Sequence, residues 1–183
     1  GCKEILLVSG SQKRATLDSV SALSLLKANP LFIGEDLSVG VAFNPYLPNL
    51  LFNEEIIRLK RKLQSELVSS IWIQFGTDYI LLKSRIKILN SILDSYYKTS
   101  TKKSNIIIFG SILIPSKQFL ARFKYRPWKG VYCSNEFLYS VNIADCIIKK
   151  IFTTYKKNNI CPIIETGIYT DNHLDKFKNK FLE

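Results

Sequence analysis

Five short apolar runs alternate with segments of helical periodicity, and this alternation limits the possible folds more than any other feature of the chain. The runs are centred near residues 5, 39, 72, 107 and 162. Between them, apolar residues return at every third or fourth position, as they do along one face of a helix. Strands that are joined through helices become parallel neighbours, so the pattern predicts an α/β fold with a parallel sheet.

The clearest of these units extends from Val39 to Phe75. We expect a strand over residues 37–43, a helix that begins with Asn53 as its N-cap, and a second strand over residues 71–75. Other helices are predicted near residues 17–28 (capped by Thr16), 80–97, 117–125, 141–158 and 174–181. Five such units in 183 residues fit a single domain, which is either an open sheet or the later part of an eight-unit barrel.

The formal net charge of +11 raises the question of an anionic partner. The lysines, however, are dispersed among many Ile and Asn residues, and no helix-turn-helix, RNP or zinc-finger pattern accompanies them. These observations argue against nucleic acid as the partner, although a basic nucleic-acid-binding module remains an alternative.

The remaining composition indicates a reduced cytoplasmic protein. No apolar run is long enough to cross a membrane. The four cysteines, Cys2, Cys133, Cys146 and Cys161, are far apart and form no CxxC pair, so we expect no metal site and cysteines that are reduced and mostly buried.

Ligands of parallel α/β folds bind at the carboxyl ends of the strands, which directs attention to the polar residues that follow each apolar run. These residues are Ser9, Gly10, Ser11, Asn44, Gln74, Asp78, Ser111, Glu165 and Thr166. None is a nucleophile with an evident base, and the single histidine, His173, falls in the terminal helix, so no catalytic residue is assigned. Gln74 is either satisfied by backbone or water, or pairs its amide with a planar heterocycle.

The central helix carries a dense basic group that includes Arg61 and Lys62. Such a group is usually a solvated face. Alternatively, one or two of its cations contact an anionic group such as a cofactor pyrophosphate, where Arg offers bidentate hydrogen bonds. Glu55, near the start of this helix, is a capping residue or a ligand to a ribose hydroxyl.

Three segments in order, Gly40-Val-Ala-Phe-Asn-Pro, Glu55-Ile-Ile-Arg-Leu-Lys-Arg-Lys-Leu and Ile73-Gln-Phe, resemble the methylenetetrahydrofolate reductase family, especially the bacterial branch that includes modules joined to homocysteine methyltransferases. The resemblance extends over nearly the whole chain. It implies a TIM (β/α)8 barrel with FAD, of which this chain covers about the last five β/α units. The implied reaction passes a hydride from NAD(P)H through FAD to 5,10-methylenetetrahydrofolate, in one-carbon metabolism and methionine biosynthesis.

The resemblance also implies a set of site residues. Gln74 matches the family glutamine that contacts folate and flavin, while Glu55, Arg61 and Lys62 match residues that hold FAD. The chain departs from the family where Ser9-Gly10-Ser11 replaces Arg-Gly-Asp, and where Lys117 replaces an aromatic residue. The family's catalytic glutamate lies on a strand that this chain does not contain.

Two interpretations follow from the resemblance. The chain is the carboxyl-terminal part of a reductase barrel, or it is a diverged non-catalytic remnant with residual flavin or folate binding. In both, an incomplete barrel exposes a strand edge on each side. We therefore expect a missing amino-terminal barrel half, or a homo-oligomer, to cover these edges.

Overall fold

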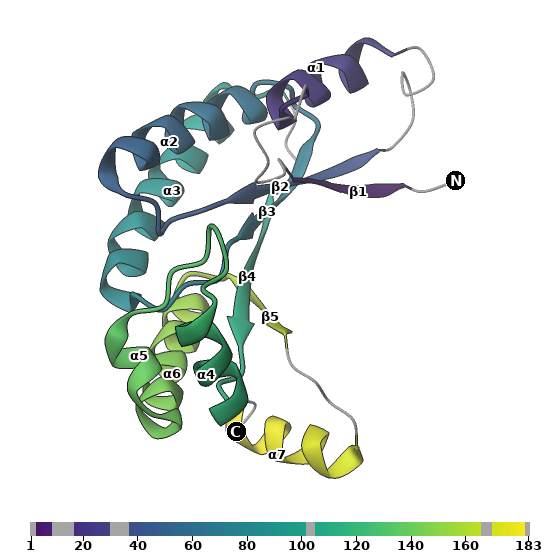
Figure 1. Cartoon of the computed structure of the whole chain (residues 1–183). Coiled ribbons are helices and arrows are strands. Elements are labelled where there is room, and N and C mark those ends of the chain that lie inside the picture. Colours follow the sequence, from purple (N-terminus) through teal and green to yellow (C-terminus); the bar gives the residue numbers. More distant parts are fainter. Residues whose placement is uncertain (1–2, 9–16, 30–36, 102–104, 166–169, 182–183) are drawn as a thin grey trace.

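The computed structural model describes residues 3–8, 17–29, 37–101, 105–165 and 170–181, and within them the chain forms a five-stranded sheet in which every pairing is parallel (Figure 1). The strand order is β1-β2-β3-β4-β5, the same as the order along the chain. The strands are β1 (Glu4–Leu7), β2 (Ser38–Phe43), β3 (Val68–Ile73), β4 (Ile107–Leu113) and β5 (Cys161–Glu165). The predicted α/β class and the alternation of strands and helices are confirmed.

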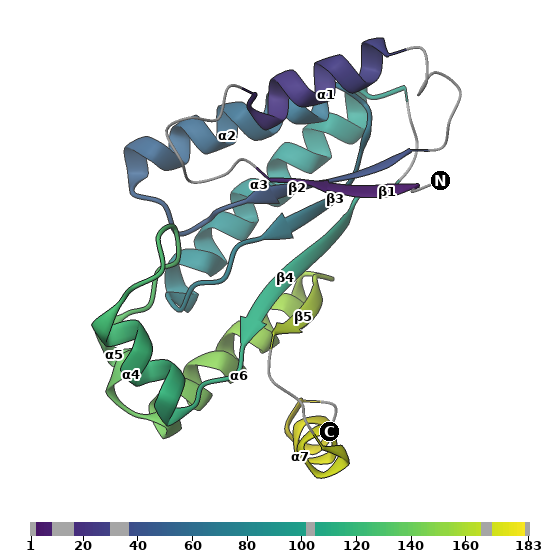
Figure 2. The same cartoon turned by 45° about the vertical axis from the view of Figure 1, so that its right-hand side comes forward.

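Seven helices lie in the described part of the chain, and those that connect the strands cover one face of the sheet (Figures 1 and 2). They are α1 (Ser19–Ala28), α2 (Asn49–Leu63), α3 (Tyr79–Thr99), α4 (Lys117–Tyr125), α5 (Asn135–Tyr139), α6 (Val141–Lys157) and α7 (Asp171–Phe181). Crossovers between parallel strands are right-handed, so successive crossovers in one direction place the connecting helices on the same face. The other face therefore has no helical cover among the described residues.

The core lies between the sheet and this helical layer. Along β2, Val39, Val41 and Phe43 are fully buried, and Ile71 and Ile73 of β3 lie beside them. Full burial of each such side chain stabilises the fold by about 1.5–3 kcal/mol. Side chains alternate along a strand, so the residues between them point to the uncovered face.

Two glycines make room for two buried tyrosine rings. A Cβ atom at Gly76 would overlap the Tyr46 ring, and one at Gly110 would overlap the Tyr155 ring. Both tyrosines are buried in the core, and this desolvation raises the pKa of each phenol above its ordinary value. The glycines are therefore required by packing and not by backbone conformation.

Several predicted boundaries are wrong, each for an identifiable reason. Asp18, not Thr16, caps α1, because its carboxylate accepts hydrogen bonds from the backbone N–H groups of Val20 and Ser21, each at 2.8 Å. Helix α2 begins at Asn49, after Pro48, and not at Asn53. Strand β3 begins at Val68, and the short helix α5 was not expected.

The earlier start of α2 buries Phe52. Its ring packs edge-on against Phe43 with the ring centroids 6.0 Å apart. On the Phe52 ring lies the guanidinium of Arg85, with 3.8 Å between its Cζ atom and the ring centroid. The same guanidinium donates hydrogen bonds to the carbonyl oxygens of Pro45 and Leu47. The loop before α2 is thus fixed by contacts that are distant in sequence.

The cysteine prediction is confirmed in one respect and wrong in another. The three described cysteines are free thiols, as expected. Cys133 is half-buried, however, and Cys146 and Cys161 are exposed, so these cysteines are not mostly buried. Burial raises the pKa of the Cys133 thiol to about 12, which keeps it protonated at neutral pH.

Candidate functional site at the uncovered sheet face

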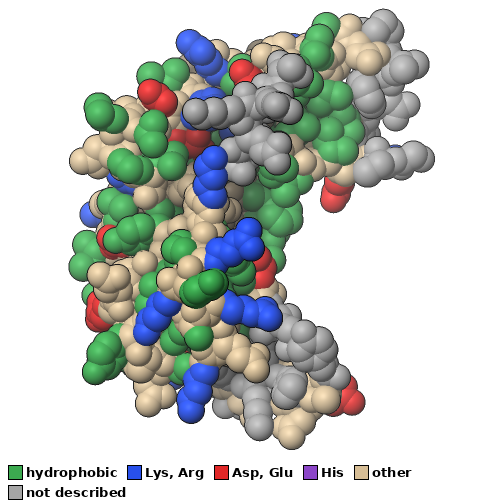
Figure 3. Space-filling model, in the orientation of Figure 1, with side chains coloured by type: hydrophobic (Ala, Val, Ile, Leu, Met, Phe, Trp, Pro, Cys, Tyr) green, Lys and Arg blue, Asp and Glu red, His purple; other side chains and the backbone are tan. Residues whose placement is uncertain are grey.

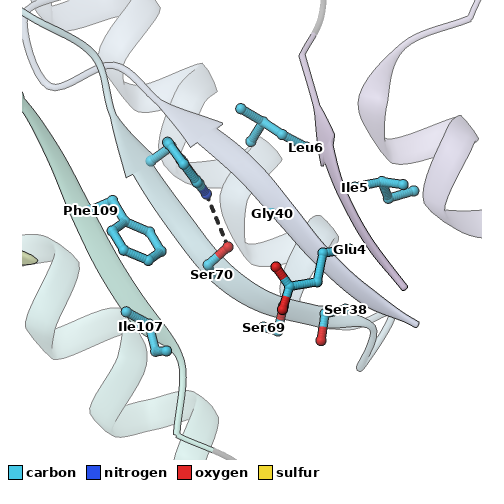
Figure 4. A pocket seen from close by; sticks show the side chains of 10 residues that line it. Glu4, Ile5, Leu6, Ser38, Gly40, Ser69, Ser70, Ile107 and Phe109 are labelled. Atoms are coloured by element: carbon cyan, nitrogen blue, oxygen red, sulfur yellow. Dashed lines mark hydrogen bonds between the residues drawn. The ribbon is translucent and has the colours of Figure 1, made fainter. Parts of the chain in front are cut away.

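The uncovered face of the sheet is hollowed, and its hollow has a volume of about 480 Å³ (Figure 4). Figure 3 shows the molecule concave on this side, with hydrophobic side chains on the wall. Leu6 and Ile107 line the hollow and are 42% and 51% exposed. Exposed apolar side chains on a concave surface are typical of a binding site or an interface.

An aromatic surface forms the floor of this hollow. The rings of Trp72 and Phe109 lie on adjacent strands with their centroids 4.7 Å apart. The Trp72 indole donates a hydrogen bond from Nε1 to the Ser70 hydroxyl, at 3.0 Å (Figure 4). A Cβ atom at Gly40 would lie 2.8 Å from that Nε1 atom, so a larger residue at this position would clash with the indole. Aromatic surfaces of this kind stack against planar ligands or pack against further strands.

Gln74 lies on the same face, at the carboxyl end of β3. Its neighbours Ile73 and Phe75 are buried toward the helices, so alternation directs the Gln74 side chain to the uncovered face. Its backbone N–H donates to the Phe43 carbonyl oxygen at 2.9 Å, which continues the pairing of β2 and β3 by one residue. The amide is half-buried and stands beyond Trp72 along the strand.

The sheet register brings two more polar residues near Gln74, on the carboxyl side of the hollow, whose lining includes none of the three. Ile73 pairs with Gly110, so Gln74 stands level with Ser111 on β4. The Ser111 hydroxyl donates a hydrogen bond to the Glu165 carboxylate at the end of β5. All three were predicted to follow an apolar run. Gln74 directly follows β3 and Glu165 is the last residue of β5, but Ser111 lies within β4, two residues before its end, so that part of the prediction is wrong.

Glu55 and Lys62 lie between α2 and the sheet. The Glu55 carboxylate accepts the backbone N–H of Asn44 at 3.2 Å, and its other oxygen is 3.6 Å from Nε of Arg58. The Lys62 ammonium donates to the Ala42 carbonyl oxygen at 3.1 Å, and burial lowers its pKa below the ordinary value. Both side chains therefore fasten α2 to the end of β2.

The four predicted ligand-binding residues do not form one cluster. Arg61 is exposed in the last turn of α2, while Glu55 and Lys62 face the sheet and Gln74 is on its opposite side. Their assignment to FAD and folate stays a prediction. Ser9, Gly10, Ser11 and Thr166 lie outside the described residues.

One loop that bonds to the residues after β2 and β3 was not predicted from the sequence. The Asn44 side chain donates from Nδ2 to the Gly130 carbonyl oxygen at 3.0 Å. Three further bonds join Thr77 to this loop. Its N–H donates to the Tyr132 carbonyl at 3.0 Å, and its hydroxyl accepts the Ser134 N–H at 2.8 Å and donates to the Ser134 hydroxyl at 3.4 Å. Gly130 has a φ of +82°, a left-handed conformation that favours glycine. The only signal in the sequence was this glycine in an irregular stretch.

No protein-family model matches the chain, and no curated protein matches it. Within the described residues, no group of three His, Cys, Asp or Glu side chains is arranged to hold a metal ion. No helix in the same residues has the length and apolar character needed to span a membrane.

Proposed function

We propose that this chain is a methylenetetrahydrofolate reductase-like flavoprotein that acts in the cytoplasm. In this role it transfers a hydride from NAD(P)H through FAD to 5,10-methylenetetrahydrofolate, a step of one-carbon metabolism that supplies methionine biosynthesis. The observation that carries the proposal is the position of Gln74, at the carboxyl end of β3 and on the face that carries the aromatic surface of Trp72 and Phe109. A side-chain amide offers a donor and an acceptor together, which suits the edge of a planar heterocycle.

The proposal includes a TIM barrel, of which this chain supplies five of the eight β/α units. Five parallel strands in chain order, with helices on one face, support it, because barrels of this type repeat that unit eight times. Three further β/α units would pair with the open edges of β1 and β5 and would cover Leu6 and Ile107. In this proposal they would come from an amino-terminal half or from another copy of the chain.

The residues present fit FAD in part. When bound, FAD supplies the ring that carries the hydride. Arg61 is exposed and free to contact a phosphate, and Gln74 is available on the uncovered face. Glu55 and Lys62 could bind a cofactor only after breaking their hydrogen bonds at the carboxyl end of β2. We therefore assign the cofactor contact to Arg61.

The first test is the visible absorption spectrum of the purified chain during titration with FAD. Arg61→Ala is compared with Lys60→Ala, which removes another exposed cation one residue away on the same helix. Loss of a charge-assisted hydrogen bond costs about 1.5–3 kcal/mol, so Arg61→Ala is expected to raise the Kd for FAD by about 10- to 100-fold. Lys60→Ala is expected to change it less than about threefold. A folded sample that binds no FAD contradicts the proposal.

A diverged barrel remnant is the second candidate, favoured by the internal bonds of Glu55 and Lys62. It would retain weak flavin or folate binding without hydride transfer. Anaerobic addition of NADH or NADPH to the FAD-loaded chain separates the two candidates. Bleaching of the flavin absorption supports the reductase, whereas bound flavin that stays oxidised supports the remnant.

A further inference from the structure

A second hollow lies on the helical side of the molecule, between α3 and α6, which pack against each other. Its volume is about 330 Å³. Lysines make up half of the residues that line it, and none of the lining residues is acidic. These lysines, called the lysine groove below, are Lys83 of α3 and Lys149, Lys150 and Lys157 of α6.

None of the four lysines of the groove forms an ion pair within the described residues. The ion pairs of the described residues join Glu55 to Arg58 and Asp175 to Lys178, and neither pair involves the groove. The acidic residues of its two helices are Asp94 and Asp145, and neither lines the groove. Four ammonium groups around one hollow repel one another, and an anion between them relieves that repulsion.

Part of the lysine groove is held in place by its neighbours. The Nζ atom of Lys150 lies 4.5 Å from the centroid of the Tyr79 ring and 3.4 Å from its hydroxyl oxygen. At the other end of the groove, the Asn158 side chain donates to the Thr154 carbonyl oxygen at 2.8 Å and pairs with Asn90 at 3.4 Å. A cation that is already positioned loses less entropy when it binds an anion.

We propose that the lysine groove binds the phosphate backbone of single-stranded nucleic acid. Lys150 and Lys157 are seven residues apart on one helix, which separates them by about 10 Å along the axis, more than one phosphate group spans. Lysine is a point charge that contacts phosphate oxygens without reading bases, so the binding is independent of sequence. The dispersed lysines of the sequence argued against nucleic acid as a partner. In the folded chain, however, four of these lysines line one hollow. The groove is on the face opposite to Gln74, and the inference is independent of the reductase proposal.

The test is the fluorescence anisotropy of a labelled single-stranded oligonucleotide of about 20 nucleotides, measured over a range of salt concentrations. The groove variant replaces its four lysines by glutamine. The control variant makes the same change at four exposed lysines elsewhere and has the same net charge: Lys27, Lys60, Lys98 and Lys124. Circular dichroism establishes that both variants are folded.

Four phosphate contacts predict a slope of log K against log salt that is about 3 units shallower in the groove variant, since each contact to a single strand contributes about 0.7. The control variant is expected to keep most of the wild-type slope. Equal losses in both variants would mean that dispersed surface charge binds the oligonucleotide, which overturns the proposal. Absence of binding by the folded wild type, or binding of inorganic polyphosphate alone, overturns it as well.

Discussion

The Nζ atom of Lys62 lies 3.1 Å from the carbonyl oxygen of Ala42, so a charged side chain of α2 bonds directly to the backbone of β2. Lys62 is only 4% exposed, and Glu55, seven residues earlier, faces the same strand end. Helix and strand are thereby joined by two charged groups of opposite sign. This relationship explains why one cation of a basic run is internal while its neighbour Arg61 is exposed.

Replacing Lys62 by methionine keeps the aliphatic stem but removes the hydrogen bond to Ala42 and the positive charge near Glu55. We expect a loss of about 1–3 kcal/mol in the free energy of unfolding, the usual cost when buried polar groups lose their partner. Urea denaturation followed by circular dichroism measures this loss. Lys60→Met, on the exposed side of the same helix, is the control and is expected to change stability by less than about 0.5 kcal/mol. Equal effects of the two substitutions would show that the Lys62 contact contributes no stability.

Gly110→Ala tests the packing of the Tyr155 ring against β4. The new Cβ atom would overlap this ring, and overpacking of a core costs about 1–3 kcal/mol. The same substitution is then made in a Tyr155→Leu background, where the smaller side chain leaves space. Thermal unfolding is expected to show a clear cost in the first background and a much smaller one in the second. A cost that does not depend on residue 155 would place the strain elsewhere.

Because the phenol of Tyr46 is buried, we expect the folded chain to lose stability at alkaline pH. Burial raises its pKa in the folded chain, so folding favours the neutral form. The resulting stability is fully present below the unfolded pKa of about 10 and declines as pH rises above it, because only the unfolded chain then ionises readily. Tyr46→Phe removes the titrating group and is expected to lessen this decline between about pH 9 and 11. Urea midpoints across that range provide the measurement, and parallel curves for both proteins would contradict it.

The sequence predicted the order and type of the main elements because local patterns determine them. Helix α4 was predicted at its observed bounds, and β2 within one residue. Contacts between distant residues are not visible in such patterns. The start of α2 is bonded by Arg85, which lies thirty-six residues after Asn49 and donates a hydrogen bond to the Asn49 side chain at 3.0 Å.

In the candidate site, too, local patterns predicted some residues, whereas contacts between distant residues were not predicted. The sequence named Gln74, Ser111 and Glu165 from the rule that ligands bind at the carboxyl ends of parallel strands. Whether Lys62 is free or engaged depends on which side of α2 meets the sheet, which a run of four basic residues in five positions does not reveal. The lysine groove likewise requires that α3 and α6 be neighbours.

The uncovered face predicts self-association of the chain. Leu6 and Ile107 are exposed there, and the edges of β1 and β5 lack a partner strand within the described residues. Unpaired parallel edges beside an apolar surface pair readily with other chains. Analytical ultracentrifugation is therefore expected to show assemblies that grow with protein concentration.

Leu6→Glu combined with Ile107→Glu places charges on this face without disturbing the core, because both side chains are already about half exposed. The double variant is expected to shift the distribution toward monomer. Leu50→Glu, at a leucine that is 81% exposed on α2, adds a charge away from the uncovered face and is expected to leave association unchanged. A wild-type chain that stays monomeric at all concentrations would contradict the prediction. It would mean that the strand edges and the apolar surface stay exposed to water without a partner.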